Sequence, residues 1–249
     1  MSTSADSVIL AIIGGTGIYD WPGLELESAS SPATPWGEVS DAIHLGRWRG
    51  ARLAFLARHG ADHSIAPHQV NYRANLWALS ELGAQRVLGI NAVGGITDAY
   101  VPATLALPDQ LIDYTWGRAC TFHEGDGAVP HPEFAEPYSS DLRHALLGAA
   151  SRAGVELIDG GCYGATQGPR LETCAEIRRM RRDGCDIVGM TGMPEAVLAR
   201  ELDLEYCCIA LSANWAAGCG DKQPITMDQV TANVRRAGEN LPALVAALI

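Results

Sequence analysis

The sequence predicts a single α/β domain, and three observations lead to this prediction. Three short apolar segments, residues 7–13, 52–57 and 86–90, each run into a turn that contains glycine. Continuous apolar segments of this kind are typical of strands buried on both faces of a parallel sheet. The chain has 249 residues, of which 47% are hydrophobic, so it is long enough to bury one large core. Because no repeat or linker interrupts the sequence, one domain over residues 1–249 is expected.

Further strands and helices are expected to alternate along the chain. The strand candidates are residues 109–114, 186–190 and 206–211, and helical patterns cover residues 71–83, 140–154, 172–182 and 194–203. We expect Gly83 and Gly154 to end two of these helices and Pro194 to lie in the first turn of another. A last helix is expected from the capping-box pattern TMDQ at residues 226–229, until Pro242 kinks or stops it.

The composition excludes several classes of protein. A net charge of −11 and the lack of a basic run argue against nucleic-acid binding. No apolar run approaches the ~20 residues of a membrane span, and the first residues lack a secretory pattern, so a cytoplasmic protein without membrane contact is expected. The seven cysteines contain no CxxC pair, which argues against a disulfide framework or a zinc site. His59, His63 and His68 lack an acidic ligand or an HExxH pattern, so no metal is expected.

The first three strand candidates end in residues suited to binding an anion. The first is followed by GGTG, whose backbone amides and Thr16 hydroxyl can face an anion, although a simple tight turn fits equally well. The second ends at Arg58 and His59, which are costly to bury unless they meet an anion or a carboxylate. The third runs into NAVGG, residues 91–95. Ligands gather at the carboxyl ends of parallel strands, so these loops are expected to share one crevice.

Two later parts of the chain also point to a site. Residues 108–137 contain the strand candidate at 109–114 and then irregular sequence rich in Gly, Pro and His, and a loop of about 25 residues in a compact domain is more often functional or interfacial than filler. Residues 160–214 contain two apolar runs that stop at small polar residues. Near these runs lie Glu172, Met190, Thr191, Glu195 and Asn214. This mixture is too polar for a plain core and predicts half of an active site.

Six motifs give the chain a resemblance to a known family. IGGTGIYD, LARHGADHSIAPHQVNYRANLWAL, NAVGGI, PHPEFAEPYS, QGPRLET and GMTGMPEAVLARE occur in this order. In these motifs the chain resembles the trimeric nucleoside phosphorylases, which include purine nucleoside phosphorylase and methylthioadenosine phosphorylase. The resemblance covers nearly the whole chain. It implies a mixed, barrel-like central sheet surrounded by helices, and a homotrimer or a dimer of trimers. It also implies reversible phosphorolysis of a nucleoside, with inorganic phosphate as co-substrate and no cofactor.

The resemblance also assigns roles to individual residues. The implied phosphate site consists of Thr16, Arg58, His59, Asn91, Ala92 and Thr191. Met190 is expected beneath the ribose, and His131 is expected to reach the sugar pocket of a neighbouring subunit. Glu172, Leu171 and Asn214 are expected to contact the purine, and the expected catalytic residues are Asn214, Glu172 and His59.

The base pocket favours a 6-oxopurine over adenine. The adenine branch of the family carries TDYD on its last strand, but Asn214 and Ala216 replace both aspartates here. The 6-oxopurine branch carries a glutamate after its GPxF motif and an asparagine on that strand, as Glu172 and Asn214 do here. Glu172 can accept the N1 hydrogen of hypoxanthine, whereas it would repel the N1 lone pair of adenine. Without Asn214 beside it, Glu172 would be interpreted as a carboxylate at a helix start.

The sugar pocket favours a thioether. Where the inosine-type branch has a histidine for the 5′-hydroxyl, this chain has Met227, which suits a methylthio group but equally fits the apolar face of the last helix. The two positions together predict 5′-methylthioinosine as substrate, formed when a deaminase acts on methylthioadenosine. The alternatives are a methylthioadenosine phosphorylase with an atypical base pocket, an inosine/guanosine phosphorylase and a non-catalytic nucleoside-binding protein. A nicotinamide-dependent oxidoreductase would explain GGTG after a strand, but not RHG or SAN.

Overall fold

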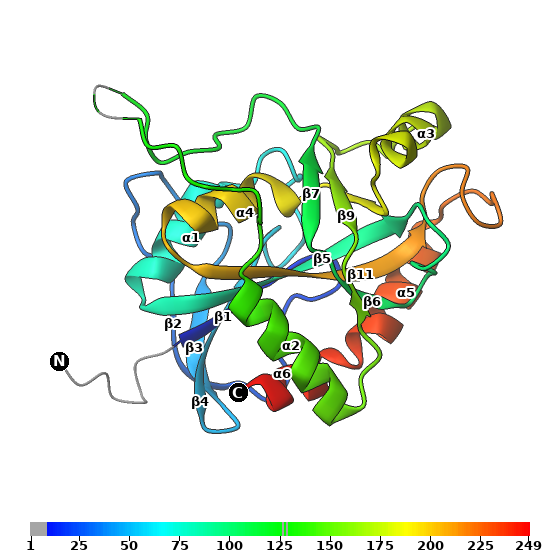
Figure 1. The fold of residues 1–249 in the computed structure, drawn as a ribbon. Helices are drawn as coiled ribbons and strands as arrows, with labels where there is room; N and C mark the ends of the chain where they lie inside the picture. The colour runs from blue at the N-terminus through cyan, green and yellow to red at the C-terminus, as the bar shows by residue number, and fades with distance from the viewer. Residues whose placement is uncertain (1–8, 126, 128) are drawn as a thin grey trace.

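The long strand β5 (Ala84–Gly95) organises the sheet. The computed structural model describes residues 9–125, 127 and 129–249, and it contains a mixed sheet of eleven strands (Figure 1). Along one edge β5 pairs in parallel with β1 (Ile9–Gly14), and along the other with β11 (Glu205–Trp215). Beyond β1 the sheet continues with β4 (Ala51–Ala57), β3 (Ile43–Trp48) and β2 (Glu25–Ser30).

The second half of the sheet closes into a barrel-like ring. Near its end β5 pairs with the antiparallel β10 (Ile187–Gly189), which leads to β9 (Cys162–Ala165) and β7 (Gln110–Asp113). On the other side, β11 leads to β6 (Leu105–Leu107) and β8 (Ile158–Asp159). Because β7 follows β6 and β9 follows β8 along the chain, the two routes meet and the ring closes. The predicted mixed, barrel-like α/β fold is therefore confirmed.

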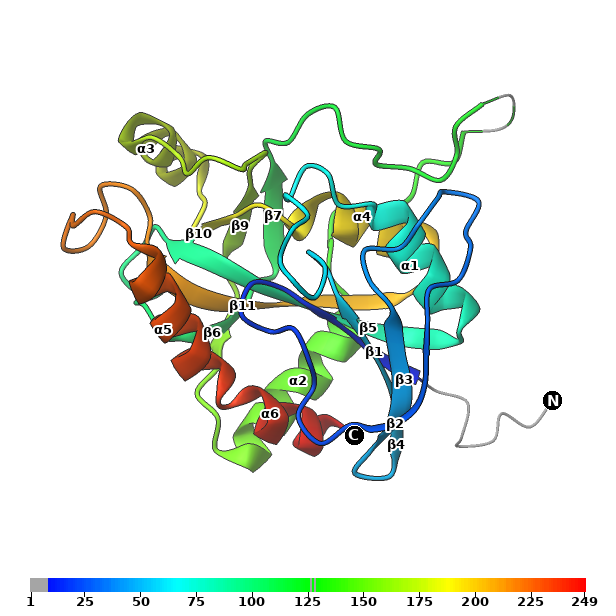
Figure 2. The same cartoon turned by 180° about the vertical axis from the view of Figure 1, so that it is seen from behind.

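Helices cover this sheet in two groups (Figures 1 and 2). Helix α1 (Tyr72–Glu81) packs against α4 (Gly192–Glu201). Helix α2 (Ser140–Ala153) packs against α6 (Leu241–Leu248), and α5 (Met227–Gly238) lies along β11. Helix α3 (Cys174–Asp183) lies at the periphery. None of the helices in the described ranges is long and apolar enough to cross a membrane.

The core consists mainly of the side chains of β1, β4, β5 and β11. Ile12, Leu56, Leu88 and Ile209, one from each strand, have no solvent exposure. This explains why the apolar runs predicted these strands. The run at residues 7–13 begins with Ser7 and Val8, which lie outside the described residues.

One predicted loop is in fact strand. Residues 91–95 continue β5, and β11 likewise extends beyond the apolar run at 206–211 to Trp215. These two strands pair with each other from Arg86 and Glu205 to Gly95 and Trp215. The pairing holds small and polar residues in extended backbone that their sequence alone does not favour. Strands β2, β3, β6, β8 and β9 were not predicted, and β2, for example, is exposed along its whole length and lacks an apolar pattern.

The helix boundaries also required corrections. The helix expected from residue 172 begins at Cys174, because Thr173 is its N-cap and forms a capping box with Glu176. The helix expected from residue 194 begins at Gly192 and is interrupted by the non-helical Met193. The expected break in the last helix is confirmed: α5 ends at Gly238 and Pro242 lies in the first turn of α6.

Candidate active site

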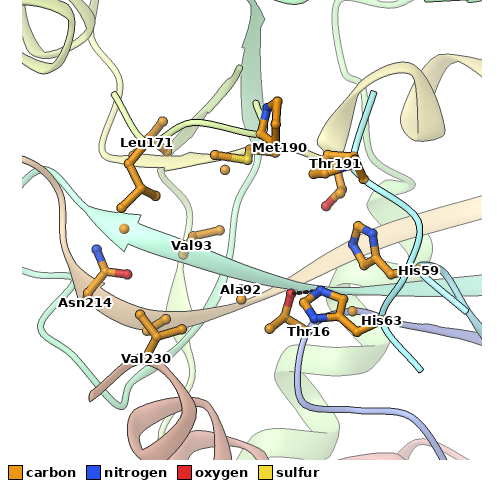
Figure 3. Close-up of a pocket in the computed structure, with 18 of the residues that line it drawn as sticks. Thr16, His59, His63, Ala92, Val93, Leu171, Met190, Thr191, Asn214 and Val230 are labelled. Atoms are coloured by element: carbon orange, nitrogen blue, oxygen red, sulfur yellow. Dashed lines mark hydrogen bonds between the residues drawn. The ribbon is translucent and has the colours of Figure 1, made fainter. Parts of the chain in front are cut away.

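A cavity of about 440 Å³ lies where β4 and β10 end and the last residues of β5 and β11 approach the start of α5 (Figure 3). Ten of the twelve predicted site residues line it: Thr16, Arg58, His59, Ala92, Leu171, Glu172, Met190, Thr191, Asn214 and Met227. The other two are elsewhere. Asn91 is buried behind Arg58, and His131 is exposed and does not line the cavity.

The cavity opens at a gap in the sheet. Strand β1 accompanies β5 only to Gly89, and β10 joins the same edge at Gly94. The intervening part of β5 includes Ala92, which lines the cavity beside the turn after β1. That turn must approach closely, since a Cβ atom on Gly15 would collide with the carbonyl oxygen of Ile90. The segments that follow the first three predicted strands therefore do share one crevice, as predicted. The third of these segments, residues 91–95, is part of strand β5 and not a loop.

A buried ion pair joins Arg58, which lines the cavity, to Glu195, which lies behind it. Arg58 and Glu195 are 0% and 1% exposed, and two hydrogen bonds of 2.7 Å join the Arg58 guanidinium to the carboxylate. Burial disfavours the charged form of Arg58, but the attraction of Glu195 and its hydrogen bonds outweigh this effect and raise the Arg58 pKa above its ordinary value. Tyr206 also donates to Glu195, at 2.8 Å. Arg58 was expected to contact an anion or a carboxylate, and the carboxylate of Glu195 confirms this expectation.

Arg58 keeps one donor for the cavity. Glu195 takes two of its five N–H groups, Asn91 Oδ1 takes one at 2.8 Å, and the carbonyl oxygen of Ile90 takes one on Nη1 at 2.9 Å. The remaining N–H is on Nη1, which lies next to the turn after β1, 2.9 Å from where a Cβ atom on Gly15 would be. Because Glu195 balances the charge of Arg58, an anion in this part of the cavity would be held largely by hydrogen bonds from neutral donors.

His59 lies in the same wall as a neutral imidazole. Its Nδ1 donates to the carbonyl oxygen of Ile65 at 2.8 Å, so Nε2 carries the lone pair. Burial and the neighbouring charge of Arg58 lower the pKa of His59 from 6.5 to about 4. A phosphate dianion beside the ring would favour the protonated form and oppose both effects. An anion bound beside His59 would therefore raise its pKa from this depressed value.

The depressed pKa of His59 predicts a loss of stability in mild acid. The unfolded chain binds a proton at this residue near pH 6.5, and the folded chain only near pH 4, so stability falls as the pH drops through this window. The loss from this one group reaches roughly 3 kcal/mol at pH 4. Urea unfolding at pH 7.5 and pH 4.5 would measure it. We expect His59→Gln to lose less stability between these two pH values than the unchanged protein, and an equal loss would contradict the assignment.

Asn214 is aimed into the cavity by a β-bulge. The register of β11 on β5 shifts between Ser212, opposite Val93, and Asn214, opposite Gly94, which leaves Ala213 as the extra residue. As a result Ala213 and Asn214 both line the cavity, although successive strand residues normally face opposite sides. The amide nitrogen of Asn214 donates to the carbonyl oxygen of Trp215 at 2.8 Å, and its oxygen points into the cavity (Figure 3).

Glu172 lines the same cavity as Asn214. It precedes the N-cap Thr173, and the carboxylate that serves the helix start is Glu176. The interpretation of Glu172 as a helix-start carboxylate is therefore wrong. One of its oxygens instead accepts a hydrogen bond of 2.6 Å from the hydroxyl of Thr166. Among the described residues Glu172 is the one carboxylate that lines the cavity.

The remaining wall is apolar. Met190 lies on the side of β10, and Ile225, Met227 and Val230 belong to the segment that begins α5. Met227 is 63% exposed and Leu171 is 50% exposed, so both lie at the rim. The alternative that Met227 belongs only to the packed face of α5 does not fit this exposure, because the buried residues of that face are Val230, Val234 and Ala237.

Arg118, which the sequence did not single out, joins two sides of the site. It comes from the long irregular segment, and its guanidinium donates to four backbone carbonyls: those of Thr166, Gln167, Met190 and Met193, at 3.1, 2.7, 2.8 and 2.6 Å. These carbonyls belong to the chain segments that lead to Glu172 and that carry Met190. The sequence could not indicate this role, because Arg118 lies in a long loop without an acidic neighbour in sequence.

Two further contacts at the site were not predicted. Glu195 was one of the polar residues that pointed to a site, but its pairing with Arg58 was missed, although an acid beside Pro194 in a largely apolar helix start needs a buried partner. His63 lines the cavity and its Nε2 lies 3.3 Å from the Thr16 hydroxyl. Its ring packs at 5.2 Å against that of His59. In the described part of the chain no three His, Cys, Asp or Glu side chains are grouped so that they could hold a metal ion.

Known proteins that are similar to this chain are phosphorylases. The sequence profile of the phosphorylase superfamily matches residues 9–249. A probable S-methyl-5'-thioinosine phosphorylase of Xanthomonas campestris pv. campestris is 58% identical over 246 residues, which cover 98% of each chain. The 6-oxopurine nucleoside phosphorylase of Pyrococcus furiosus is 43% identical, with 96% of this chain and 91% of that one covered. The structure of a methylthioadenosine phosphorylase of Schistosoma mansoni in complex with adenine matches with a TM-score of 0.93 at 30% identity, covering 97% of this chain and 90% of that one.

Proposed function

Because the chain belongs to the phosphorylase superfamily, we propose that its cavity catalyses the reversible phosphorolysis of S-methyl-5'-thioinosine to hypoxanthine and 5-methylthioribose 1-phosphate. The observation that carries this proposal is the pairing of Glu172 with Asn214 in one cavity that also has an apolar wall. The substrate named for the Xanthomonas campestris relative supports it.

The base end of the cavity matches a 6-oxopurine. The carboxylate of Glu172 can accept only, which suits the N1 hydrogen of hypoxanthine and disfavours the bare N1 of adenine. Asn214 offers both functions: its second amide hydrogen can reach O6, and its oxygen can accept a hydrogen bond from a proton at N7. The side-chain nitrogen is already oriented by Trp215, which fixes the oxygen toward the cavity. A polar mismatch in a site of this kind discriminates by roughly 10⁴-fold.

The proposed reaction transfers the sugar from the purine to phosphate. A phosphate oxygen forms a bond to C1′ while the bond from C1′ to N9 breaks, and the electron pair of that bond passes to the purine, which takes up a proton from solvent at N7 and leaves as hypoxanthine. Asn214 stabilises the departing base through the proton at N7. Phosphate would be held beneath C1′ by Thr16, Arg58, His59, Ala92 and Thr191. We assign Asn91 an indirect part, since it contacts Arg58 and does not line the cavity.

The sugar end suits a methylthio group. Met227, Ile225 and Val230 form an apolar wall near the start of α5, and Met190 lies on the opposite side of the cavity. A thioether buries well against such side chains, whereas a 5′-hydroxyl would find no polar partner among them. The homotrimer, the contact of His131 with a neighbouring subunit and the location in the cytoplasm remain predictions of the sequence.

An ultraviolet assay with three nucleosides tests the proposal. With methylthioinosine, inosine and methylthioadenosine compared in phosphate buffer, we expect kcat/KM to be highest for methylthioinosine. Inosine should be about 10- to 200-fold poorer because it lacks the thioether contact, and methylthioadenosine poorer still, by roughly 10⁴-fold. Base release must depend on phosphate. Turnover that is best with methylthioadenosine would contradict the roles of Glu172 and Asn214, and turnover that is best with inosine would contradict that of Met227.

A further inference from the structure

Thr166 is the side chain that holds Glu172 in place. It directly follows β9, is 7% exposed, and its hydroxyl donates to Glu172 Oε1 at 2.6 Å. Its backbone is fixed on both sides: the Thr166 N–H donates to the carbonyl oxygen of Gly189 at 2.8 Å, and its own carbonyl accepts from Arg118. The hydroxyl therefore approaches Glu172 from a rigid base.

The Thr166 hydroxyl has two acceptors and one proton. Besides Glu172 Oε1, the carbonyl oxygen of Gly189 lies 3.3 Å away from it. A hydroxyl can donate to only one acceptor at a time. The carboxylate is the closer acceptor, and hydrogen bonds to an ionised group are shorter and stronger than those to a neutral one. Thr166 therefore donates to Glu172, and Gly189 is its partner only when Glu172 is absent.

No other side chain fixes the Glu172 carboxylate in the described residues. The nearby Arg170 is engaged elsewhere, since it forms two hydrogen bonds of 2.7 and 2.9 Å with Glu176. Glu172 also lies before the N-cap of α3, so no helical backbone restrains it. A glutamate side chain in such a position has several rotatable bonds, and fixing them when a ligand binds costs conformational entropy. A contact that orders the side chain beforehand removes this cost from the binding step.

We propose that Thr166 is a positioning residue that sets the preference for 6-oxopurines, by holding Glu172 Oε1 so that Oε2 is free to accept the N1 hydrogen of the base. This inference rests on the proposed function and extends it to a residue that does not itself line the cavity. Thr166 acts before the substrate arrives, so its contribution appears in the binding of the nucleoside and not in the breaking of the bond.

The test compares Thr166→Val, which removes the hydroxyl at nearly constant shape, with Thr166→Ser, which keeps it. In Thr166→Val we expect the KM for methylthioinosine to rise about 10- to 100-fold, as for a lost hydrogen bond to a charged group, with kcat and the KM for phosphate changed less than about 3-fold. Thr166→Ser should restore the KM to within about 3-fold of the unchanged protein. If Thr166→Val does not fold, Thr166→Ala serves in its place.

A double-mutant cycle separates positioning from a general structural role. In a Glu172→Ala background the change of Thr166 to valine should alter the KM less than about 3-fold, because the partner it positions is gone. If Thr166→Val still raised the KM for methylthioinosine 10-fold or more in the Glu172→Ala background, the inference would be overturned. It would also be overturned if Thr166→Val alone left this KM unaltered. The proposed function fails separately, if the unchanged protein does not turn over methylthioinosine or if Glu172→Ala leaves its KM unaffected.

Discussion

Replacing Asn214 with alanine is expected to lower kcat for methylthioinosine about 10²- to 10³-fold, the usual effect of losing one group that stabilises charge in a transition state. The proton at N7 would lose its acceptor while the purine departs. The stability of the fold should change little, because Asn214 is only half-buried and its side chain donates one hydrogen bond, to the carbonyl oxygen of the adjacent Trp215. Such a hydrogen bond contributes about 1 kcal/mol to stability. Steady-state kinetics beside a urea unfolding curve would measure both effects.

Asn240→Ala is the matched control for this variant. Asn240 precedes α6, is exposed, and makes no side-chain hydrogen bond to the helix it caps. Its replacement should leave kcat and the unfolding curve unchanged. If Asn214→Ala retained more than about a tenth of the kcat, the role of Asn214 at N7 would be wrong. If it lost activity only together with several kcal/mol of stability, the residue would be structural.

The second large effect is expected from Glu195→Gln. This change leaves the buried Arg58 without its counter-charge, and breaking a buried pair from one side costs about 3–5 kcal/mol of unfolding free energy. It should also impair phosphate binding, because the two hydrogen bonds that Arg58 donates to Glu195 set the direction in which the free N–H of Arg58 points. We expect a higher KM for phosphate together with an earlier urea midpoint, measured at equal protein concentration.

The chain offers an exposed pair of the same chemistry as the control. Glu205 accepts from Arg86 Nε at 2.8 Å, close to the 2.7 Å of the buried pair, but its side chain is 37% exposed and that of Arg86 is 40% exposed. Glu205→Gln should cost less than about 1 kcal/mol and leave the KM for phosphate unchanged. Equal effects of the two substitutions would mean that burial does not determine the strength of the Arg58 pair.

The main features of the fold follow from local sequence. Continuous apolar runs predicted β1, β4 and β10, and the first halves of β5 and β11, because strands inside a covered sheet have no polar face. Glycine caps and N-cap residues predicted several helix ends. The exposed β2 and the short strands β6, β8 and β9 were missed for the same reason, since strands without an apolar pattern are determined by the neighbours that pair with them.

The sequence was sufficient to identify the family and to group Arg58 and His59 at a strand end, and it led to the proposal that Glu172 and Asn214 contact the base. These are short motifs, and the chemistry of a motif can be read from neighbouring residues. The tertiary structure was needed to show that the cavity opens at the gap between β1 and β10 beside β5, that Arg58 meets Glu195 across 137 positions of the chain, and that a bulge turns Asn214 inward. It also placed Thr166 beside Glu172. Such contacts depend on strand order and register, which bring together residues that carry no local signal of one another.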